Sequence, residues 1–293
     1  MCDMKNMIYR ISLIAAGLLL AFACTDPDID PTPQEPDNSG QTEQEKQPVL
    51  PDSGFKSQFQ RHMALWEFTG AWCANCPSGY TNMNFVLSTN PDFANVHPMA
   101  FHSNSNDEDD LAVPDTDQIM QAMNVLELGF PSYVVDMALG GSLVEGVNLT
   151  EHLYEMKDEY PCFCGVAVTS ELNDGKADVK VRLTSELDAV WRVGVYVVED
   201  KVKYYQKDGM KEHDAYTHRH VVRRIVSASY RGDRIGGQLT AAGTEVQAEY
   251  DIEVDSEWNL DNTCIYVLAI DSRGYVNNVN FCAIDGGADY NRI

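Results

Sequence analysis

Beyond residue 60, apolar positions follow first a mixed period and then a strict period of two. Residues 63–70 (MALWEFTG) predict a buried strand, and residues 77–89 predict a helix with one apolar face. The same alternation of strand and helix continues to about residue 160. Its further members are a strand over 95–103 that Pro98 bends or keeps near an edge, a helix over 118–126, two strands within 129–146 joined by a turn at Gly140-Gly141, and a helix over 148–160.

After Pro161 the period becomes two and stays so. Residues 162–168, 178–183 and 245–254 alternate apolar and polar side chains, as strands with one buried face do. Residues 190–200 and 263–271 are apolar throughout and predict central strands. We therefore expect two domains, an α/β domain over 55–160 and an all-β, immunoglobulin-like antiparallel β-sandwich over 161–293.

The first 24 residues have the pattern of an export signal. Lys5 and Arg10 precede an apolar run over 11–23, which is shorter than the roughly 20 residues that a membrane-spanning helix needs. The end of the run, Leu-Ala-Phe-Ala-Cys, resembles a bacterial lipoprotein signal, which implies lipidation of Cys24. The alternative is an ordinary signal peptide with an incidental cysteine.

Residues 25–54 predict an extended tether between that signal and the folded body. They contain six of the twelve prolines, no aromatic residue, and eight acidic residues against one lysine. Such a segment buries too little apolar surface to offset the entropy cost of ordering. The net charge of −24 argues against nucleic acid as a partner and against electrostatic docking on anionic lipid. We therefore expect membrane contact to come through the lipid on Cys24.

The segment Trp72-Cys73-Ala74-Asn75-Cys76 places two cysteines three positions apart where a strand gives way to a helix. Backbone N–H groups at a helix N-terminus stabilise a thiolate, and a second cysteine one turn later can attack a disulfide formed on the first. The arrangement resembles the thioredoxin superfamily. The resemblance implies that Cys73 is the nucleophile, Cys76 the resolving thiol, and Trp72 a contact for the substrate.

Two further positions match the same superfamily. Glu67, six residues before Cys73, stands where thioredoxins carry a buried acid that relays the proton of the resolving cysteine; the alternative is a glutamate turned to solvent. Phe130-Pro131 resembles the cis-proline loop that binds the substrate chain; the alternative is an ordinary trans proline at the start of a strand.

Other candidate ligands predict neither a metal site nor a cofactor. Cys162 and Cys164 lie in the second domain and are expected to be buried thiols, which leaves a zinc site at the CxxC without its other ligands. His218 and His220 could share a metal, but surface histidines are the expected outcome. The acidic run 104–110 lacks the spacing of an EF-hand and predicts a solvated loop. Cys264 and Cys282 either pair with each other or stay buried.

A basic island over 201–234 holds nine of the twenty-one lysines and arginines. It predicts either a solvated pair of strands with a loop, or a surface for an acidic partner or for self-association. Together with the lipoprotein signal and "FTGAWCANCPSG", the block from Tyr196 to Gly236 looks like the Omp twenty-eight-related family of outer-membrane lipoproteins. The resemblance implies a thioredoxin-like domain followed by a β-sandwich, anchored in the outer membrane and facing either the periplasm or the cell surface.

Two functions follow from these patterns. The first is a membrane-tethered thiol–disulfide oxidoreductase that acts on the thiols or disulfides of exported proteins through Cys73 and Cys76. The second is a non-catalytic binding or adhesion lipoprotein, in which the thioredoxin-like fold is a scaffold and Cys73–Cys76 is a structural disulfide.

Overall fold

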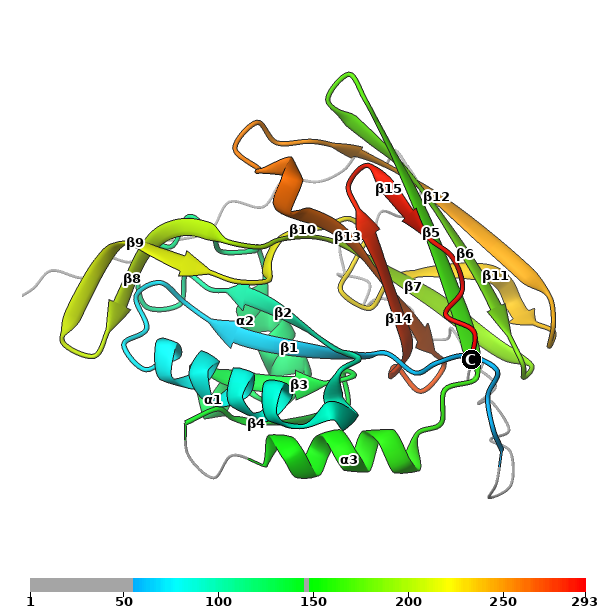
Figure 1. Cartoon of the computed structure of the whole chain (residues 1–293), viewed down its shortest axis with the longest axis horizontal. Coiled ribbons are helices and arrows are strands. Elements are labelled where there is room, and N and C mark those ends of the chain that lie inside the picture. The colour runs from blue at the N-terminus through cyan, green and yellow to red at the C-terminus, as the bar shows by residue number, and fades with distance from the viewer. Residues whose placement is uncertain (1–54, 145–147) are drawn as a thin grey trace, which may run out of the picture. The chain divides into compact units, whose positions relative to one another are not determined.

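The computed structural model of the chain describes residues 55–144 and 148–293. The export signal, Cys24 and the acidic tether lie outside these residues. Strands predominate over helices in the described part (Figure 1). None of its helices is both long enough and apolar enough to span a membrane. The α-helices there are α1 (Cys76–Thr89), α2 (Thr116–Ala122) and α3 (Leu149–Glu159), and short 3₁₀ turns cover Pro91–Phe93, Leu126–Leu128 and Leu260–Asn262.

A mixed sheet contains strands from before and from after residue 160. Its strand order is β14-β13-β7-β10-β2-β1-β3-β4, and β11 also pairs with β7. Strands β1 and β2 are parallel, and β3 is antiparallel to β1. The pairing of Val221 with Ala100 joins β10 to β2 and so connects strands on either side of residue 160. The strands are β1 (Met63–Thr69), β2 (Val96–His102), β3 (Ser132–Val135), β4 (Leu139–Ser142), β7 (Ala189–Glu199), β10 (Val221–Ile225), β11 (Asp233–Thr240), β13 (Thr263–Asp271) and β14 (Val276–Ala283).

A second, antiparallel sheet has the order β12-β6-β5-β15. Its inward side chains pack against one face of β7 and β13 around Trp191, so two sheets enclose this core. The alternation predicted for residues 178–183 is confirmed, because Val179, Val181 and Leu183 are buried there. A separate hairpin is formed by β8 and β9. The remaining strands are β5 (Cys164–Asn173), β6 (Lys176–Ser185), β8 (Val202–Asp208), β9 (Lys211–His218), β12 (Glu245–Glu253) and β15 (Gly286–Ala288).

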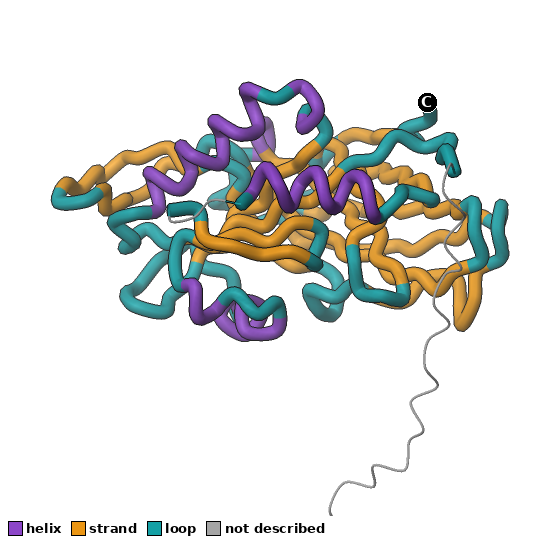
Figure 2. The backbone as a smooth tube through the Cα atoms, turned by 90° about the horizontal axis from the view of Figure 1, so that it is seen from below, coloured by secondary structure: helices purple, strands orange, loops and turns teal. Residues whose placement is uncertain are grey.

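The helices cover the part of the mixed sheet that contains β1 and β3. Alternate residues of β1 point to opposite faces, so Leu65 packs with α1 and α3, while Trp66 packs with α2 and with β7 and β13. Figure 2, seen from below, shows the helices gathered over this part of the sheet. The start of α1 therefore lies at one end of β1, where the functional site is expected.

Two local predictions need correction. The turn between β3 and β4 lies at Asp136-Met137, both with positive φ, and not at Gly140-Gly141. The two glycines lie inside β4 instead. Glycine is needed there at position 140 because a Cβ would lie 2.4 Å from the Val125 side chain. The second helix begins at Thr116 and ends at Ala122, and a 3₁₀ turn replaces its predicted end.

Pro98 lies inside the sheet, on β2, and not on an edge strand. The pairing of β10 with β2 is at Ala100 and not at Pro98, so β10 does not require the N–H that this proline lacks. On the other side of β2, Pro98 is in register with Leu65 of β1.

Candidate functional site

The Cys73–Cys76 pair is a disulfide at the N-terminus of α1. The two Cα atoms are 5.4 Å apart, and Cys76 is the first residue of the helix. Pro77 follows within the first turn, where no backbone donor is needed. The side chains are almost fully covered, with 5% of Cys73 and 2% of Cys76 exposed. A thiolate released here would face the free N–H groups of the helix, which favour negative charge.

Glu67 lies on β1 beneath this helix and is 3% exposed. The alternative of a solvent-facing glutamate is thus excluded. Burial raises the pKa of its carboxyl group to about 8, and no side chain or backbone group of the described residues hydrogen-bonds to it. The carboxyl group lines a pocket of about 20 Å³ that Cys76 also lines. That volume is sufficient for one water molecule.

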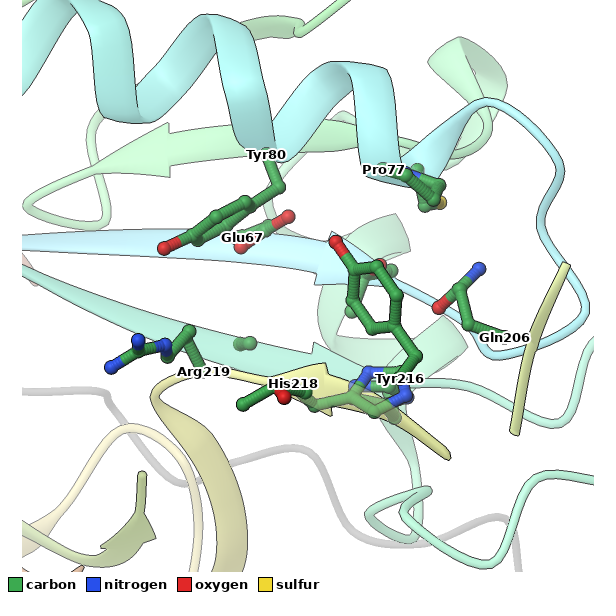
Figure 3. Close-up of a pocket in the computed structure, with 12 residues that line it drawn as sticks. Glu67, Pro77, Tyr80, Gln206, Tyr216, His218 and Arg219 are labelled. Atoms are coloured by element: carbon green, nitrogen blue, oxygen red, sulfur yellow. The ribbon is translucent and has the colours of Figure 1, made fainter. Parts of the chain in front are cut away.

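Figure 3 shows which other side chains surround this pocket. Tyr80 of α1 lies over Glu67, while Tyr216 and His218 approach from the opposite side on β9. The pocket is therefore closed partly by the helix that carries the disulfide and partly by a hairpin from the second half of the chain.

The three residues expected to contact a substrate lie next to the disulfide. The Phe130–Pro131 peptide bond is cis. Pro131 packs directly on α1, because a Cβ added to Gly79 would lie 2.3 Å from its Cγ. The rings of Trp72 and Phe130 meet edge to face, 5.1 Å between centroids, and the Trp72 indole donates to Ser103 O over 2.7 Å. Both rings are half-buried, so they present part of their surface beside the disulfide.

The β8–β9 hairpin holds the backbone of the CxxC loop, a contact that the sequence did not predict. The Gln206 side chain donates to Cys73 O over 3.0 Å and is 2% exposed. The backbone N–H of Lys207 donates to Ala71 O over 2.8 Å, and that of Gly209 donates to Ala74 O over 2.9 Å. Part of the basic island thus covers the CxxC loop and is not a free strand pair.

A buried Asp–His pair is the second feature that sequence reasoning missed. The His102 Nδ1 lies 2.7 Å from Asp109 Oδ2, and both side chains are buried. Burial alone would raise the pKa of Asp109, but hydrogen bonds from His102 and the backbone of Ala71 and Leu111 outweigh it and lower the pKa. The prediction of a wholly solvated acidic loop over 104–110 is therefore wrong at Asp109.

His218 corrects the expectation of surface histidines. It is 6% exposed, its ring meets that of His102 at 5.0 Å, and its Nε2 lies 3.1 Å from Tyr205 O. Burial lowers the pKa of His218 to about 4, with the neighbouring His102 adding to the effect. His220 is half-buried in a turn with positive φ. The described residues contain no cluster of His, Cys, Asp or Glu that could hold a metal ion.

The other cysteines of the described chain are thiols. Cys264 stands opposite Ala283 and Cys282 opposite Ile265 in the β13–β14 register. Residues directly opposite each other share a face, so Cys264 and Cys282 point to opposite faces and do not pair. Cys162 and Cys164 are both buried, and burial raises the pKa of both thiols.

One protein family matches the chain from residue 116 to residue 286. The sequence model described as outer membrane protein Omp28 matches residues 116–286. No curated protein matches the sequence. The matched region includes Pro131, the hairpin and the sandwich, and it begins after the disulfide.

Two solved structures resemble this chain at low sequence identity, and the first of them shares its fold. HBP35 of Porphyromonas gingivalis is 16% identical with a TM-score of 0.63, and the match covers 78% of this chain and 77% of that chain. A protein from Agrobacterium tumefaciens is 13% identical with a TM-score of 0.46, and the match covers 77% of this chain and 96% of that chain.

The Omp28 match spans more than half of the 293 residues. The chain therefore belongs to the Omp28 family of outer membrane proteins.

Proposed function

We propose that this Omp28-family protein is a lipid-anchored thiol–disulfide exchange protein of the outer membrane, with Cys73 as nucleophile and Cys76 as resolving thiol. One observation carries the proposal. The disulfide lies at the N-terminus of α1, and its second cysteine shares a pocket with the buried acid Glu67. Perturbed acids beside a nucleophile are typical of functional sites.

The arrangement of residues 55–160 supports a thioredoxin-like module. Its strand order is β2-β1-β3-β4 with β1 and β2 parallel, and helices lie on both faces. The cis Phe130–Pro131 bond directly before β3 matches the substrate loop of that superfamily. We propose that residues 161–293 form an immunoglobulin-like sandwich attached to it through β10, and that Cys24 carries the lipid.

In the exchange reaction, the Cys73 thiolate attacks a disulfide of an exported protein and releases one thiolate of that substrate. Cys76 then attacks Cys73 Sγ, which restores the Cys73–Cys76 disulfide and expels the second substrate thiol. Glu67 moves the proton of Cys76, while Pro131, Phe130 and Trp72 align the substrate chain. The Cys73–Cys76 dithiol loses two electrons and becomes a disulfide, and the substrate disulfide gains these two electrons and becomes two thiols.

A second function rests on the coverage of the disulfide. Both cysteine side chains are nearly buried, and the hairpin holds the loop that carries them. A structural disulfide in a binding or adhesion lipoprotein would have the same coverage.

A redox titration separates the two functions. The Cys73–Cys76 pair is equilibrated with glutathione buffers and read by alkylation and mass, with Cys162→Ser as the matched control. A midpoint between about −270 and −120 mV supports exchange, and a pair that stays oxidised below about −300 mV supports the structural disulfide. In the latter case, replacing both cysteines with serine removes stability but no thiol activity.

A further inference from the structure

The pocket beside Cys76 contains more acid–base chemistry than a single relay acid. Parallel pairing places Glu67 opposite Ala100 and Thr69 opposite His102, so all four side chains share one face of the sheet. All four line the same pocket of about 20 Å³. Glu67 and His102 therefore lie diagonally across the β1–β2 pair and line one pocket whose volume is sufficient for about one water molecule.

Asp109 determines which nitrogen of His102 faces this pocket. The aspartate accepts from Ala71 N over 2.7 Å and from Leu111 N over 2.9 Å, which keeps it ionised and in place. Its other contact is His102 Nδ1, so this nitrogen carries a proton and donates it to the carboxylate. No described residue hydrogen-bonds to His102 Nε2, the other nitrogen of a ring that lines the pocket.

A relay through Glu67 alone is incomplete at neutral pH. With a pKa of about 8, the carboxyl group is mostly protonated at pH 7 and takes no further proton without losing its own. A neutral carboxylic acid can accept a proton on one oxygen and give its own from the other, provided that a base stands beyond it.

Resting on the function proposed above, we propose that His102, oriented by Asp109, is that terminal base and receives the proton of Cys76 by way of Glu67. In the resolving step the Cys76 S–H proton passes to Glu67, and the Glu67 proton passes across the pocket to His102 Nε2. Cys76 Sγ attacks Cys73 Sγ and the substrate thiolate leaves. The imidazolium formed is stabilised by the Asp109 carboxylate, as in other Asp–His pairs.

The other charged and titratable groups around this pocket leave His102 as the base. His218 donates through Nε2 to Tyr205 O, and its pKa of about 4 makes it a poor proton acceptor at neutral pH. Burial raises the pKa of the two tyrosines, so they stay protonated. Besides His102 and Cys76, the charged or titratable groups that line the pocket are Glu67 from β1, Tyr80 from α1, and Tyr216, His218 and Arg219 from the hairpin and its end. Asp109, from the loop after β2, contacts His102 itself.

The test uses the full-length protein in detergent with oxidised glutathione as the probe disulfide. In a Cys76→Ser background, attack by Cys73 is followed as glutathione adduct by mass. With both cysteines present, the rate at which the Cys73–Cys76 disulfide forms rises with the concentration of glutathione disulfide and then levels off. This limiting first-order rate constant reports the resolving step.

His102→Asn keeps a donor for Asp109 but removes the pocket-facing base. We expect it to slow the resolving step about tenfold to a hundredfold at pH 7 and to leave Cys73 attack unchanged. The defect should vanish above about pH 9, where Glu67 is ionised and accepts the proton itself. Asp109→Asn should give a smaller defect in the same direction, and His213→Asn on the exposed part of the hairpin should give none.

Three outcomes would overturn the proposal: an unchanged resolving rate, equal slowing of both steps, or a defect that persists at high pH. Failure of Cys73 to form any adduct in the Cys76→Ser protein is a different result. It would refute thiol–disulfide exchange itself, because the first step does not involve His102.

Discussion

Pro131 lies directly on Gly79, so the cis-proline loop and the helix that begins at Cys76 touch without a side chain between them. A Cβ at position 79 would lie 2.3 Å from Pro131 Cγ and 3.2 Å from Leu143 Cβ. Real side chains do not approach so closely, so one of the two segments would have to move. Glycine at position 79 therefore sets the spacing between α1 and the cis-proline loop.

Gly79→Ala should separate this loop from the disulfide. Alanine normally stabilises a helix by about 1 kcal/mol relative to glycine, but overpacking costs about 1–3 kcal/mol, so we expect a net loss of stability. Urea unfolding measures this change, and reduction of glutathione disulfide reports the effect on exchange. Ser78→Ala, on the exposed side of the same helix turn, is the control and should not destabilise the protein. If Gly79→Ala is more stable than wild type, the cis-proline loop shifts to accept the added Cβ at little cost in free energy, and the prediction is wrong.

Glu67→Gln should stabilise the protein at neutral pH. The carboxyl pKa rises from 4.5 to about 8 in the folded chain, so ionisation is disfavoured there. The folded state holds its proton while the unfolded chain releases it, and stability is therefore lost as pH rises from 4.5 to 8. The variant escapes a cost of about 3 kcal/mol at pH 7 and gains nothing at pH 4.

Unfolding free energies of the oxidised protein at both pH values check this prediction. Glu171→Gln on the exposed face of β5 provides the matched control. Equal stability of wild type and Glu67→Gln at pH 7 would mean that the carboxyl group is better solvated than its burial implies.

Asp136→Ala should be strongly destabilising. Asp136 is completely buried, pairs with Arg61 at 2.6 Å and accepts from Ala64 N at 2.8 Å. Its removal leaves the largely covered Arg61 guanidinium, 12% exposed, without its partner and the Ala64 N–H without its acceptor, and we expect a loss of about 3 kcal/mol. Asp136→Asn should cost less, because asparagine tolerates the positive φ and keeps an acceptor for Ala64.

The exposed ion pair of Lys157 with Asp92 offers the comparison. Its partners are 39% and 53% exposed, so Asp92→Ala should change stability by less than about 1 kcal/mol. Similar losses for Asp92→Ala and Asp136→Ala in urea unfolding would refute the role assigned to the Arg61 pair.

Gln206→Ala should make the disulfide easier to reach. The glutamine side chain anchors the hairpin to Cys73 O, and loss of its hydrogen bonds lowers the cost of local opening by about 1.5 kcal/mol. Reduction of Cys73–Cys76 by a water-soluble phosphine should then be about tenfold faster. Gln247→Ala on the exposed face of β12 should leave the rate as in wild type. No acceleration would mean that the hairpin does not control access.

Much of the topology was predictable from periodicity, because each strand with one buried face keeps a period of two. The β1 strand, α1, and the strands β5, β6, β7, β12 and β13 lie where their patterns predicted, whereas no pattern marked β11, β14 or β15. The turn at Asp136-Met137 was not predictable, since Asp136 adopts its positive φ while bonded to Arg61 and Ala64, which are distant in sequence.

The site was predictable where local spacing or the thioredoxin resemblance marked its residues, the latter at Phe130 and Pro131. The CxxC spacing and the preceding strand indicated Cys73, Cys76 and Glu67 because they lie within ten residues of one another. Asp109 sits in a run of acidic residues that reads as solvated, and its burial depends on contacts to Ala71 and His102. The hairpin over the loop depends on the long-range pairing of β10 with β2, which no local pattern reports.

The hydrogen bond from Gln206 to Cys73 O joins residues 133 positions apart. A chain that enters the cell envelope from its N-terminus presents Cys73 and Cys76 well before Gln206 arrives. The hairpin that covers the CxxC loop therefore comes from a part of the chain that follows the cysteines by more than a hundred residues, and the disulfide is covered only once that part has folded back onto it. Before the hairpin docks, Cys73 and Cys76 lack this cover; afterwards both are nearly buried.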